Sequence, residues 1–281
     1  MNNFGGNWTE NKIEILVEYA KAYLTIMNKH KYFKPFYFDG FAGSGFIKEK
    51  SKLDKKTVLG AAKRIIDIEE PIPFEQYYFV EKDEDKFNSL KKATKDYRDK
   101  KIYVVNTDCN DKLKSLSKFL QKKRNKNTRV LAYIDPCGMQ LEWSSIECLK
   151  NLGIDFWVLV PTGLGVNRLL KKNGEISDAW LSKLEVFLGM NREEIKNVFY
   201  EKSRQISLFG DERFDKVSNA IEKSADLYKN RLHEIFSYIS EAYVLKNSSN
   251  SIMFHFFMAS NNKFATKIAN DIIKKYNKAN V

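Results

Sequence analysis

The sequence predicts an α/β protein with a sheet of parallel strands, a C-terminal antiparallel hairpin and a helical insertion. Three observations support this fold class. Short apolar runs alternate with amphipathic segments over residues 1–170, a pattern typical of parallel strands joined by helices. An acidic residue follows four of these runs, where parallel strands bind ligands. Near the C-terminus, two strand-like runs flank a polar turn, Asn247–Asn250.

The pattern places each element. Five short β-branched or aromatic runs are the expected parallel strands: residues 36–38, 76–80, 102–106, 130–134 and 156–160. Apolar residues at helical spacing predict the intervening helices: residues 8–28, 58–68, 85–97, 110–122 and 144–152. Residues 178–239 have helical patterns without a strand, so we expect a helical insertion over residues 171–240. The sheet domain then comprises residues 1–170 and 241–281, with a hairpin of 242–246 and 251–260 and a final helix, 263–274.

The composition is that of a soluble globular protein, since 43% of the 281 residues are hydrophobic and 30% are charged. No apolar run approaches the roughly 20 residues that span a bilayer, and the N-terminus lacks the order of a signal peptide. Cys109, Cys137 and Cys148 form no Cys-x-x-Cys pair, and the histidines are scattered. We therefore expect a cytoplasmic protein without a membrane contact, a disulfide framework or a bound metal.

The chain is strongly basic. Lysine and arginine number 48 against 36 acidic residues, which gives a net charge of +12. This excess favours polyanionic partners, because basic side chains neutralise phosphates. A lysine-rich composition without functional meaning is the alternative explanation, since lysines greatly outnumber arginines. We expect a nucleic acid, DNA or RNA, as a partner.

The stretch Asp39-Gly-Phe-Ala-Gly-Ser-Gly45 follows the first predicted strand. Its glycines allow a sharp turn and a close approach of the backbone to a ligand. The spacing differs from that of dinucleotide-binding and P-loop motifs. An acid directly after the strand fits a ligand with a positive end, such as S-adenosylmethionine (SAM), although an ordinary turn is the alternative. The candidate cofactor-binding residues of this loop are Asp39, Gly40, Phe41, Gly43 and Gly45.

Two further acids close the second and third predicted strands. Glu81 could accept both hydroxyls of a ribose, because a carboxylate takes two hydrogen bonds side by side. Asp108 could accept from an adenine amine, with the backbone of Cys109 nearby. Helix N-capping is the alternative role for both acids, and Asp83 and Asn110 are competing candidates for the caps.

The sequence Asp135-Pro136-Cys137-Gly138 follows the fourth strand, where it would face a transferable methyl group. The Asp135 carboxylate and the following carbonyls could accept hydrogen bonds from an exocyclic amine. This would align the amine lone pair for in-line attack, a positional effect rather than acid–base catalysis. We therefore assign a catalytic role to Asp135 and Pro136. A tight turn is the alternative, because Pro and Gly alone suffice to make one.

The residues beside this pair are candidates for substrate binding. A flipped base needs an aromatic ring on which to stack, and Gly138 cannot supply one. Trp143 and Phe41 are the available aromatic residues. Cys137 offers a competing mechanism, in which its thiolate attacks a pyrimidine carbon before methylation.

Three basic features have possible functions. Arg168 follows the fifth strand on a glycine-containing loop, where it could contact a phosphate or carboxylate, or simply start a solvated helix. Lys12, on the first helix, is a further candidate for ligand contact. The basic segment 122–129 precedes a strand, so we expect a solvated turn at the end of the sheet opposite the ligand.

Taken together, the motifs resemble the three-Cys-motif partner (TcmP) family. The matching residues are Asp39 to Gly45, Glu81, Asp108, Asp135 to Gly138 with Trp143, and Pro161 to Arg168. The match runs in order through residues 8–170 and resumes in the terminal hairpin and helix, but the insertion has no matching motif. The family is similar to class I SAM-dependent methyltransferases of the Rossmann-like fold. It usually has an aromatic residue where this chain has Cys137.

The resemblance implies a Rossmann-like methyltransferase sheet, SAM as the cofactor, and a bacterial or phage partner protein with a three-cysteine, radical-SAM-like motif. With the residue pattern, it predicts methyl transfer to an amino nitrogen of a nucleic-acid base. Two alternatives stay open. The chain could be a non-catalytic adaptor that serves the three-cysteine partner, or an enzyme that modifies a protein or a small molecule.

Overall fold

The structure is a computed structural model that describes residues 7–47, 58–172, 175–203 and 214–278. Within these residues the main sheet has eight strands. They are β1 (Lys34–Asp39), β4 (Gln76–Glu81), β5 (Ile102–Asn106), β6 (Thr128–Ile134), β7 (Ile154–Val160), β10 (Tyr238–Ile239), β11 (Tyr243–Lys246) and β12 (Ile252–Ser260). The expected sheet strands are therefore confirmed, some with slightly different ends.

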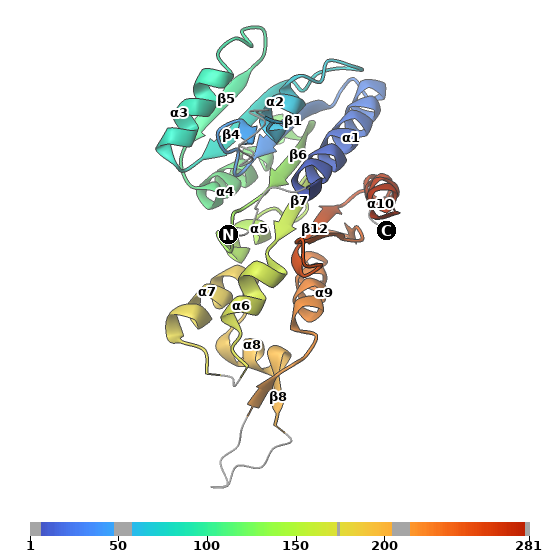
Figure 1. Ribbon diagram of the computed structural model, residues 1–281. Helices are drawn as coiled ribbons and strands as arrows, with labels where there is room; N and C mark the ends of the chain where they lie inside the picture. The colour runs from blue at the N-terminus through green and yellow to red at the C-terminus, as the bar shows by residue number, and fades with distance from the viewer. Residues whose placement is uncertain (1–6, 48–57, 173–174, 204–213, 279–281) are drawn as a thin grey trace.

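The strand order of the main sheet is β10–β12–β7–β6–β1–β4–β5, and β11 also pairs with β12. The five strands from β7 to β5 are parallel to one another. β12 is antiparallel to β7 and pairs antiparallel with β10 and β11 along its other edge. This arrangement confirms the predicted fold class, a Rossmann-like sheet with an antiparallel hairpin at its C-terminal end (Figure 1).

Helices and short hairpins connect these strands. The longer helices are α1 (Asn7–Lys29), α3 (Glu84–Ala93), α4 (Cys109–Leu120), α7 (Asp178–Leu188), α8 (Arg192–Phe199), α9 (Ala220–Leu232) and α10 (Lys263–Lys278). The shorter ones are α2 (Ala61–Ile66), α5 (Trp143–Glu147), α6 (Asn167–Leu169), a 3-10 turn (Lys123–Asn125) and a π-helical turn (Thr162–Val166). Two hairpins stand apart from the main sheet: β2 (Phe46–Ile47) with β3 (Val58–Leu59), and β8 (Tyr200–Lys202) with β9 (Phe214–Lys216).

Three predicted helices differ from the structure, and one of them, expected over residues 144–152, ends at Glu147. The helix expected over residues 58–68 begins only at Ala61, because Val58 and Leu59 pair with β2 as a strand. The helix expected over residues 85–97 ends at Ala93, where Thr94 caps it with hydrogen bonds back to the last turn. The polar loop expected over residues 49–56 lies outside the described residues.

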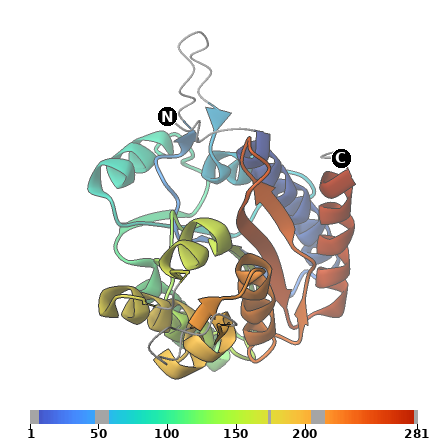
Figure 2. The same ribbon diagram turned by 60° about the horizontal axis from the view of Figure 1, so that its bottom comes forward.

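Strand alternation directs the side chains of the sheet to two layers of helices. α1, α2, α3 and α10 bury one face, where Tyr37, Tyr77 and Trp157 lie in the core. α4, α5, α7 and α9 bury the other face over Phe38, Val130 and Phe156. The first and last helices lie side by side (Figure 2).

The described helices of the segment 171–240 and its β8–β9 hairpin lie below the sheet in Figure 1. Its helices α7 and α9 share a hydrophobic core with the strands β6 and β7. The expectation that residues 178–239 are helical without a strand is wrong, because β8 and β9 form a hairpin and β10 joins the edge of the main sheet. The limits of an inserted domain, residues 171–240, stay a prediction.

Candidate cofactor site

Four acids lie at the carboxyl ends of neighbouring parallel strands. Asp39 and Glu81 are the last residues of β1 and β4, Asp135 follows β6 directly, and Asp108 lies two residues beyond β5. β1 is central, because β4 pairs along one of its edges and β6 along the other. The chain reverses direction across the sheet there, which is the place where open α/β sheets bind ligands. The strand-end positions predicted from the sequence are confirmed.

The glycine loop after β1 is held tightly against the sheet. Gly40 donates to the carbonyl oxygen of Tyr133 at 2.9 Å. A Cβ atom at Gly40 would lie only 2.5 Å from the Cys109 sulfur, so a larger residue does not fit there. Gly43 and Gly45 adopt φ angles of +65° and +77°, which glycine tolerates far better than other residues. The loop thus depends on all three glycines.

Glu81 fastens the glycine loop to β4. Its Oε2 atom accepts from the Gly43 amide at 2.8 Å, and its Oε1 atom accepts from the Asp83 amide at 2.9 Å. The Ala42 amide adds a bond to the carbonyl oxygen of Val80 at 3.0 Å. A carboxylate accepts about four hydrogen bonds, so Glu81 keeps capacity for further donors. Its predicted role at a ribose stays a prediction.

Asp39 is the most deeply buried acid of the site, with 1% of its surface exposed. Its Oδ1 atom accepts from the Phe41 amide at 3.1 Å, and its Oδ2 atom lies 3.4 Å from the Tyr37 hydroxyl. Burial, together with the negative charges of Asp135 and Glu81, outweighs these hydrogen bonds and raises the pKa of Asp39 from 3.8 to about 8. A cation placed beside this carboxyl would favour its ionised form.

The raised pKa of Asp39 predicts a pH-dependent stability. Between about pH 4 and pH 8 this carboxyl is protonated in the folded chain and ionised in the unfolded chain. The folded state therefore binds more protons, and its free energy of unfolding falls as the pH rises, by up to about 1.4 kcal/mol per pH unit. Urea unfolding of wild type and Asp39→Asn at pH 6 and pH 7.5 measures this. The variant lacks the titrating group, so parallel pH curves for the two proteins would contradict the prediction.

Asp108 caps α4 at its N-terminus. Its Oδ1 atom accepts from the backbone and side-chain nitrogens of Asn110, both at 2.9 Å, and Lys82 donates to Oδ2 at 3.0 Å. Partial burial opposes ionisation, but the hydrogen bonds and the Lys82 charge outweigh it and lower the pKa of Asp108. The N-cap alternative is therefore observed for Asp108, as it is for Asp83 on α3. A contact with adenine stays a prediction.

Cys109 fills the space beneath Gly40 and is 3% exposed. Burial raises the pKa of its thiol well above the usual range, with a smaller contribution from Asp108. The side chain is therefore a packing element of the site rather than a nucleophile. Its backbone remains the predicted point of cofactor contact.

Asp135 forms a partly buried ion pair with a residue of the first helix. Lys12 of α1 donates to its Oδ2 atom at 2.5 Å, and the Tyr133 hydroxyl donates to the same atom at 2.9 Å. The Lys12 side chain is only 5% exposed, whereas that of Asp135 is 24% exposed. Within the described residues, the Oδ1 atom of Asp135 has no hydrogen-bond partner. One carboxylate oxygen is thus fixed and the other is free to accept.

The loop after Asp135 is tied to the N-terminus of α4. Asn110 donates to the carbonyl oxygen of Gln140 at 2.9 Å and accepts from the Glu142 amide at 2.8 Å. Gln140 in turn accepts from the Cys137 amide at 3.0 Å. Pro136 is buried, whereas the Cys137 side chain is exposed. This network fixes the direction in which the chain leaves the end of β6.

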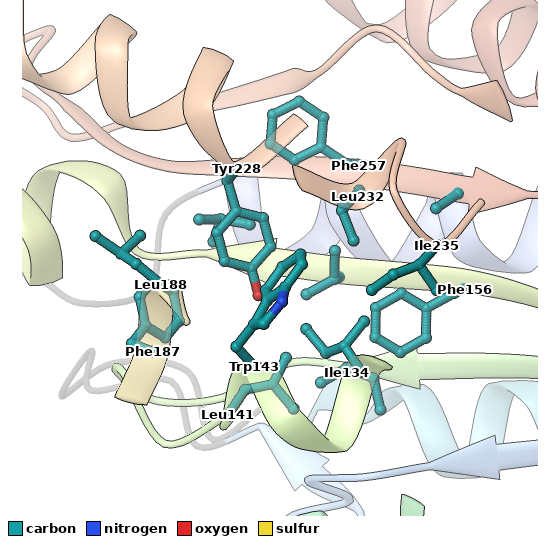
Figure 3. Packing of buried hydrophobic residues seen from close by; sticks show 14 of the residues in the cluster. Ile134, Leu141, Trp143, Phe156, Phe187, Leu188, Tyr228, Leu232, Ile235 and Phe257 are labelled. Atoms are coloured by element: carbon teal, nitrogen blue, oxygen red, sulfur yellow. The ribbon is translucent and has the colours of Figure 1, made fainter. Parts of the chain in front are cut away.

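Trp143 does not have the position that a stacking platform requires. It is 1% exposed, and its ring packs edge-on against Tyr228 at a centroid distance of 5.5 Å (Figure 3). The guanidinium of Arg231 lies 4.6 Å from the ring centroid. The predicted substrate-binding role of Trp143 is therefore wrong, because the ring is a core residue. Phe41 is partly buried against the same core, and its role stays a prediction.

The remaining predicted residues of the substrate site are less constrained. Arg168 lies exposed on α6, after a π-helical turn at the end of β7. Gly138 has open space where a Cβ atom would stand, so packing does not require a glycine there. Contacts of these two residues with a substrate stay predictions. A neighbouring pair that sequence reasoning missed, Thr162 and His255, lies 2.8 Å apart, and burial lowers the pKa of His255 to about 4.

Other kinds of site are not found among the described residues. No group of histidine, cysteine, aspartate and glutamate side chains there could hold a metal ion. In the same part of the chain, no helix has the length and apolar character needed to cross a membrane. All three cysteines are free thiols.

Comparisons with known proteins support the fold. Neither protein-family models nor curated protein sequences match this chain. A crystal structure of a Legionella pneumophila protein described by the family model DUF519 matches 95% of this chain and 91% of its own, with 13% identity and a TM-score of 0.54. This likeness shows a shared fold.

A second solved structure is Trm1 from Pyrococcus horikoshii in complex with S-adenosyl-L-methionine. It is 10% identical over 96% of this chain and 58% of its own, with a TM-score of 0.44. The second likeness is too low to support an argument. The parallel sheet with its antiparallel C-terminal hairpin is consistent with the class I methyltransferase fold.

Proposed function

We propose that this protein is a SAM-dependent methyltransferase that acts on an amino nitrogen of a nucleic-acid base. The observation that carries the proposal is the convergence of buried acids and glycine-loop amides at the end of β1. Asp39 is nearly inaccessible and has no cation beside it within the described residues, although Asp135 and Glu81 add to the negative charge around it. A cofactor with an ammonium group would favour the ionised form of Asp39 and pair with it.

The residues of the loop fit such a cofactor. Gly43 has open space where a Cβ atom would stand, so the backbone there can lie close to a ligand. In the proposed site, Asp39 and the loop amides hold the amino-acid end, Glu81 the ribose, and Asp108 with the Cys109 backbone the adenine. SAM, when bound, supplies an electrophilic methyl group on its sulfonium.

Asp135 is the residue that would orient the acceptor. Lys12 and Tyr133 both bind its Oδ2 atom, which fixes the carboxylate plane and leaves Oδ1 for an amine donor. In this proposal, the amine donates hydrogen bonds to Oδ1 and to the backbone carbonyl that follows Asp135. Its lone pair then points toward the methyl group of the cofactor. Such orientation accelerates the attack of the amine on the methyl group by position, rather than by acid–base catalysis. The net charge of +12 supports a nucleic acid as the carrier of that amine.

Calorimetric titration tests the cofactor site. SAM and its demethylated product are titrated into wild type, Asp39→Asn and the matched control Asp85→Asn, whose side chain is exposed on α3. We expect micromolar binding to wild type and to the control, and at least about tenfold weaker binding to Asp39→Asn, since an ionised pair in a buried site is worth 1.4 kcal/mol or more. Equal affinity in all three folded proteins would refute the site. Transfer of a labelled methyl group to total DNA and RNA then tests the reaction.

A non-catalytic adaptor is the second candidate. One observation favours it: Cys137 stands where the resembling family has an aromatic residue. An adaptor would bind SAM without turning it over, alone or with a three-cysteine partner protein. SAM binding with no methyl transfer to any nucleic acid, in the presence of that partner, would favour this candidate over the enzyme.

A further inference from the structure

A row of aromatic side chains crosses the face of the sheet at its free edge. Phe38 of β1 is in register with Tyr78 of β4, and Tyr78 is in register with Tyr103 of β5. The Phe38 and Tyr78 rings are stacked, with centroids 6.0 Å apart and planes 6° apart. The Tyr78 and Tyr103 centroids are also 6.0 Å apart. Tyr103 is 46% exposed, so the outer end of the row is open to solvent.

Helices cover this face near Phe38, which is 2% exposed, and leave it open at its outer end, around Tyr103. α3 packs against the opposite face of the sheet, where its Leu90 is fully buried. α4 lies along only one side of the row, and its Phe119 stacks against Phe36 at a centroid distance of 6.2 Å. A groove of about 250 Å³ remains between α4 and the strands, lined by Phe36, Phe38, Gln76, Tyr78, Lys112 and Phe119. Phe36 and Tyr78 are half-buried in this groove, so their rings stay partly accessible to a ligand.

The groove is bordered by a long basic segment. Residues 112–134, which comprise most of α4 and β6 and the loop between them, contain eight lysines and arginines and no acid. Lys112 lines the groove, and the exposed Lys122, Lys123, Arg124 and Lys126 follow α4. This loop adjoins the beginning of β1, because the Lys34 amide donates to the carbonyl oxygen of Asn127 at 3.0 Å. The solvated turn expected over residues 122–129 is thus found beside the start of β1, at the end of the sheet opposite the acids.

We propose that the aromatic row and the basic segment together bind single-stranded nucleic acid. Unpaired bases stack on exposed aromatic rings with little dependence on sequence, whereas the bases of a duplex are inaccessible to such rings. The lysines and Arg124 beside the row bind the phosphates of the same strand. A second copy of this chain is a poor occupant, because it would bring the same positive segment to the interface.

This inference goes beyond the proposed reaction, because it concerns a surface in the middle of the β-strands and requires no cofactor. It also indicates from which side the substrate would approach the cofactor site. Phe38 immediately precedes Asp39. A nucleic-acid strand that crosses the aromatic row in the direction of the β-strands therefore leads toward their carboxyl ends, where the acids converge. The unpaired bases held there are the form in which an exocyclic amine is accessible.

Fluorescence anisotropy tests this proposal in the absence of SAM. The probes are labelled oligonucleotides of about 12 nucleotides, single-stranded and as the matched duplex, a length within the range that stacking platforms cover. We expect tighter binding of the single strand, and a loss of about 5- to 100-fold in Tyr103→Ala, since one stacked base contributes that factor. Tyr103→Phe keeps the ring and should bind as wild type does. The control Tyr238→Ala removes another exposed tyrosine, 38% accessible, on β10 at the opposite edge of the sheet, and should have no effect.

Charge variants complete the test. Lys123→Ala should reduce the slope of log affinity against log salt concentration by about one, because one phosphate contact is lost. The proposal would be overturned if the protein bound duplex and single strand equally and Tyr103→Ala had no effect. Binding would then be nonspecific and due to charge alone. A dimer that Tyr103→Ala dissociates, with unchanged oligonucleotide affinity, would overturn it in favour of a protein interface. SAM titration of Tyr103→Ala measures the cofactor site separately. A failure of the nucleic-acid proposal can therefore be distinguished from a failure of the proposed SAM site.

Discussion

Asp135→Ala is expected to lower the rate of methyl transfer by roughly 10²–10³-fold, a loss typical of removing a group that positions the reacting atoms. The physical reason is geometric. Lys12 and Tyr133 hold the Oδ2 atom, and the free Oδ1 atom is the acceptor that would orient the amine. SAM affinity should change by less than about threefold, because Asp135 acts on the acceptor. Single-turnover transfer of a labelled methyl group, beside SAM calorimetry, measures both quantities.

The effect of Asp135→Ala on the stability of the fold has to be separated from its effect on the rate of methyl transfer. Removing Asp135 leaves the Lys12 ammonium buried without its partner, at a cost of up to about 3–5 kcal/mol. The double variant Lys12→Met/Asp135→Ala removes both charges and should recover most of that stability. If the rate stays low in the double variant, the loss belongs to the reaction. Methyl transfer at the wild-type rate in stable Asp135→Ala would remove Asp135 from the mechanism.

Trp143→Ala is expected to destabilise the fold by about 3–5 kcal/mol, the usual cost of truncating a large buried aromatic residue. The ring is 1% exposed and packs between Tyr228 and the Arg231 guanidinium. A Cβ atom at Gly189 would approach the ring to 2.2 Å, so the ring packs directly against the backbone of that glycine. Urea unfolding monitored by far-UV circular dichroism measures the change.

Trp180 offers a matched control for this variant. It lies on α7 with 38% of its surface exposed, and Trp180→Ala should cost less than about 1 kcal/mol. The comparison also distinguishes a core residue from a substrate platform. If Trp143→Ala retained wild-type stability but bound nucleic acid more weakly, the assignment of Trp143 to the core would be wrong.

Local patterns were sufficient for the sheet and for the positions of its acids. A strand of β-branched and aromatic residues has a side-chain period of two, and an acid directly after it lies at the strand end whatever the rest of the fold does. Asp39, Glu81 and Asp135 were placed correctly for this reason. The glycine loop was recognisable because positive φ angles at Gly43 and Gly45 demand glycine in the sequence itself.

Most of the features that the sequence did not predict depend on contacts between residues far apart in the chain. Lys12 interrupts the apolar stripe of α1, a visible signal, but its partner Asp135 lies 123 positions away. Trp143 looked available because it follows the Asp135 motif closely, yet α9 from the segment 171–240 buries it. The β8–β9 hairpin was hidden because strands of three residues are too short to show a period.

The amino-acid sequence by itself determined the α/β class, the order of the strands along the chain and the acids at their ends. Each of these depends on residues that are close in the sequence. Tertiary structure alone decided which side chains face one another: the Lys12–Asp135 pair, the burial of Trp143, and the aromatic row of Phe38, Tyr78 and Tyr103 beside the basic segment. These contacts depend on which strands become neighbours and on which faces the helices cover. Both are set by the packing energy of the whole chain rather than by any local pattern.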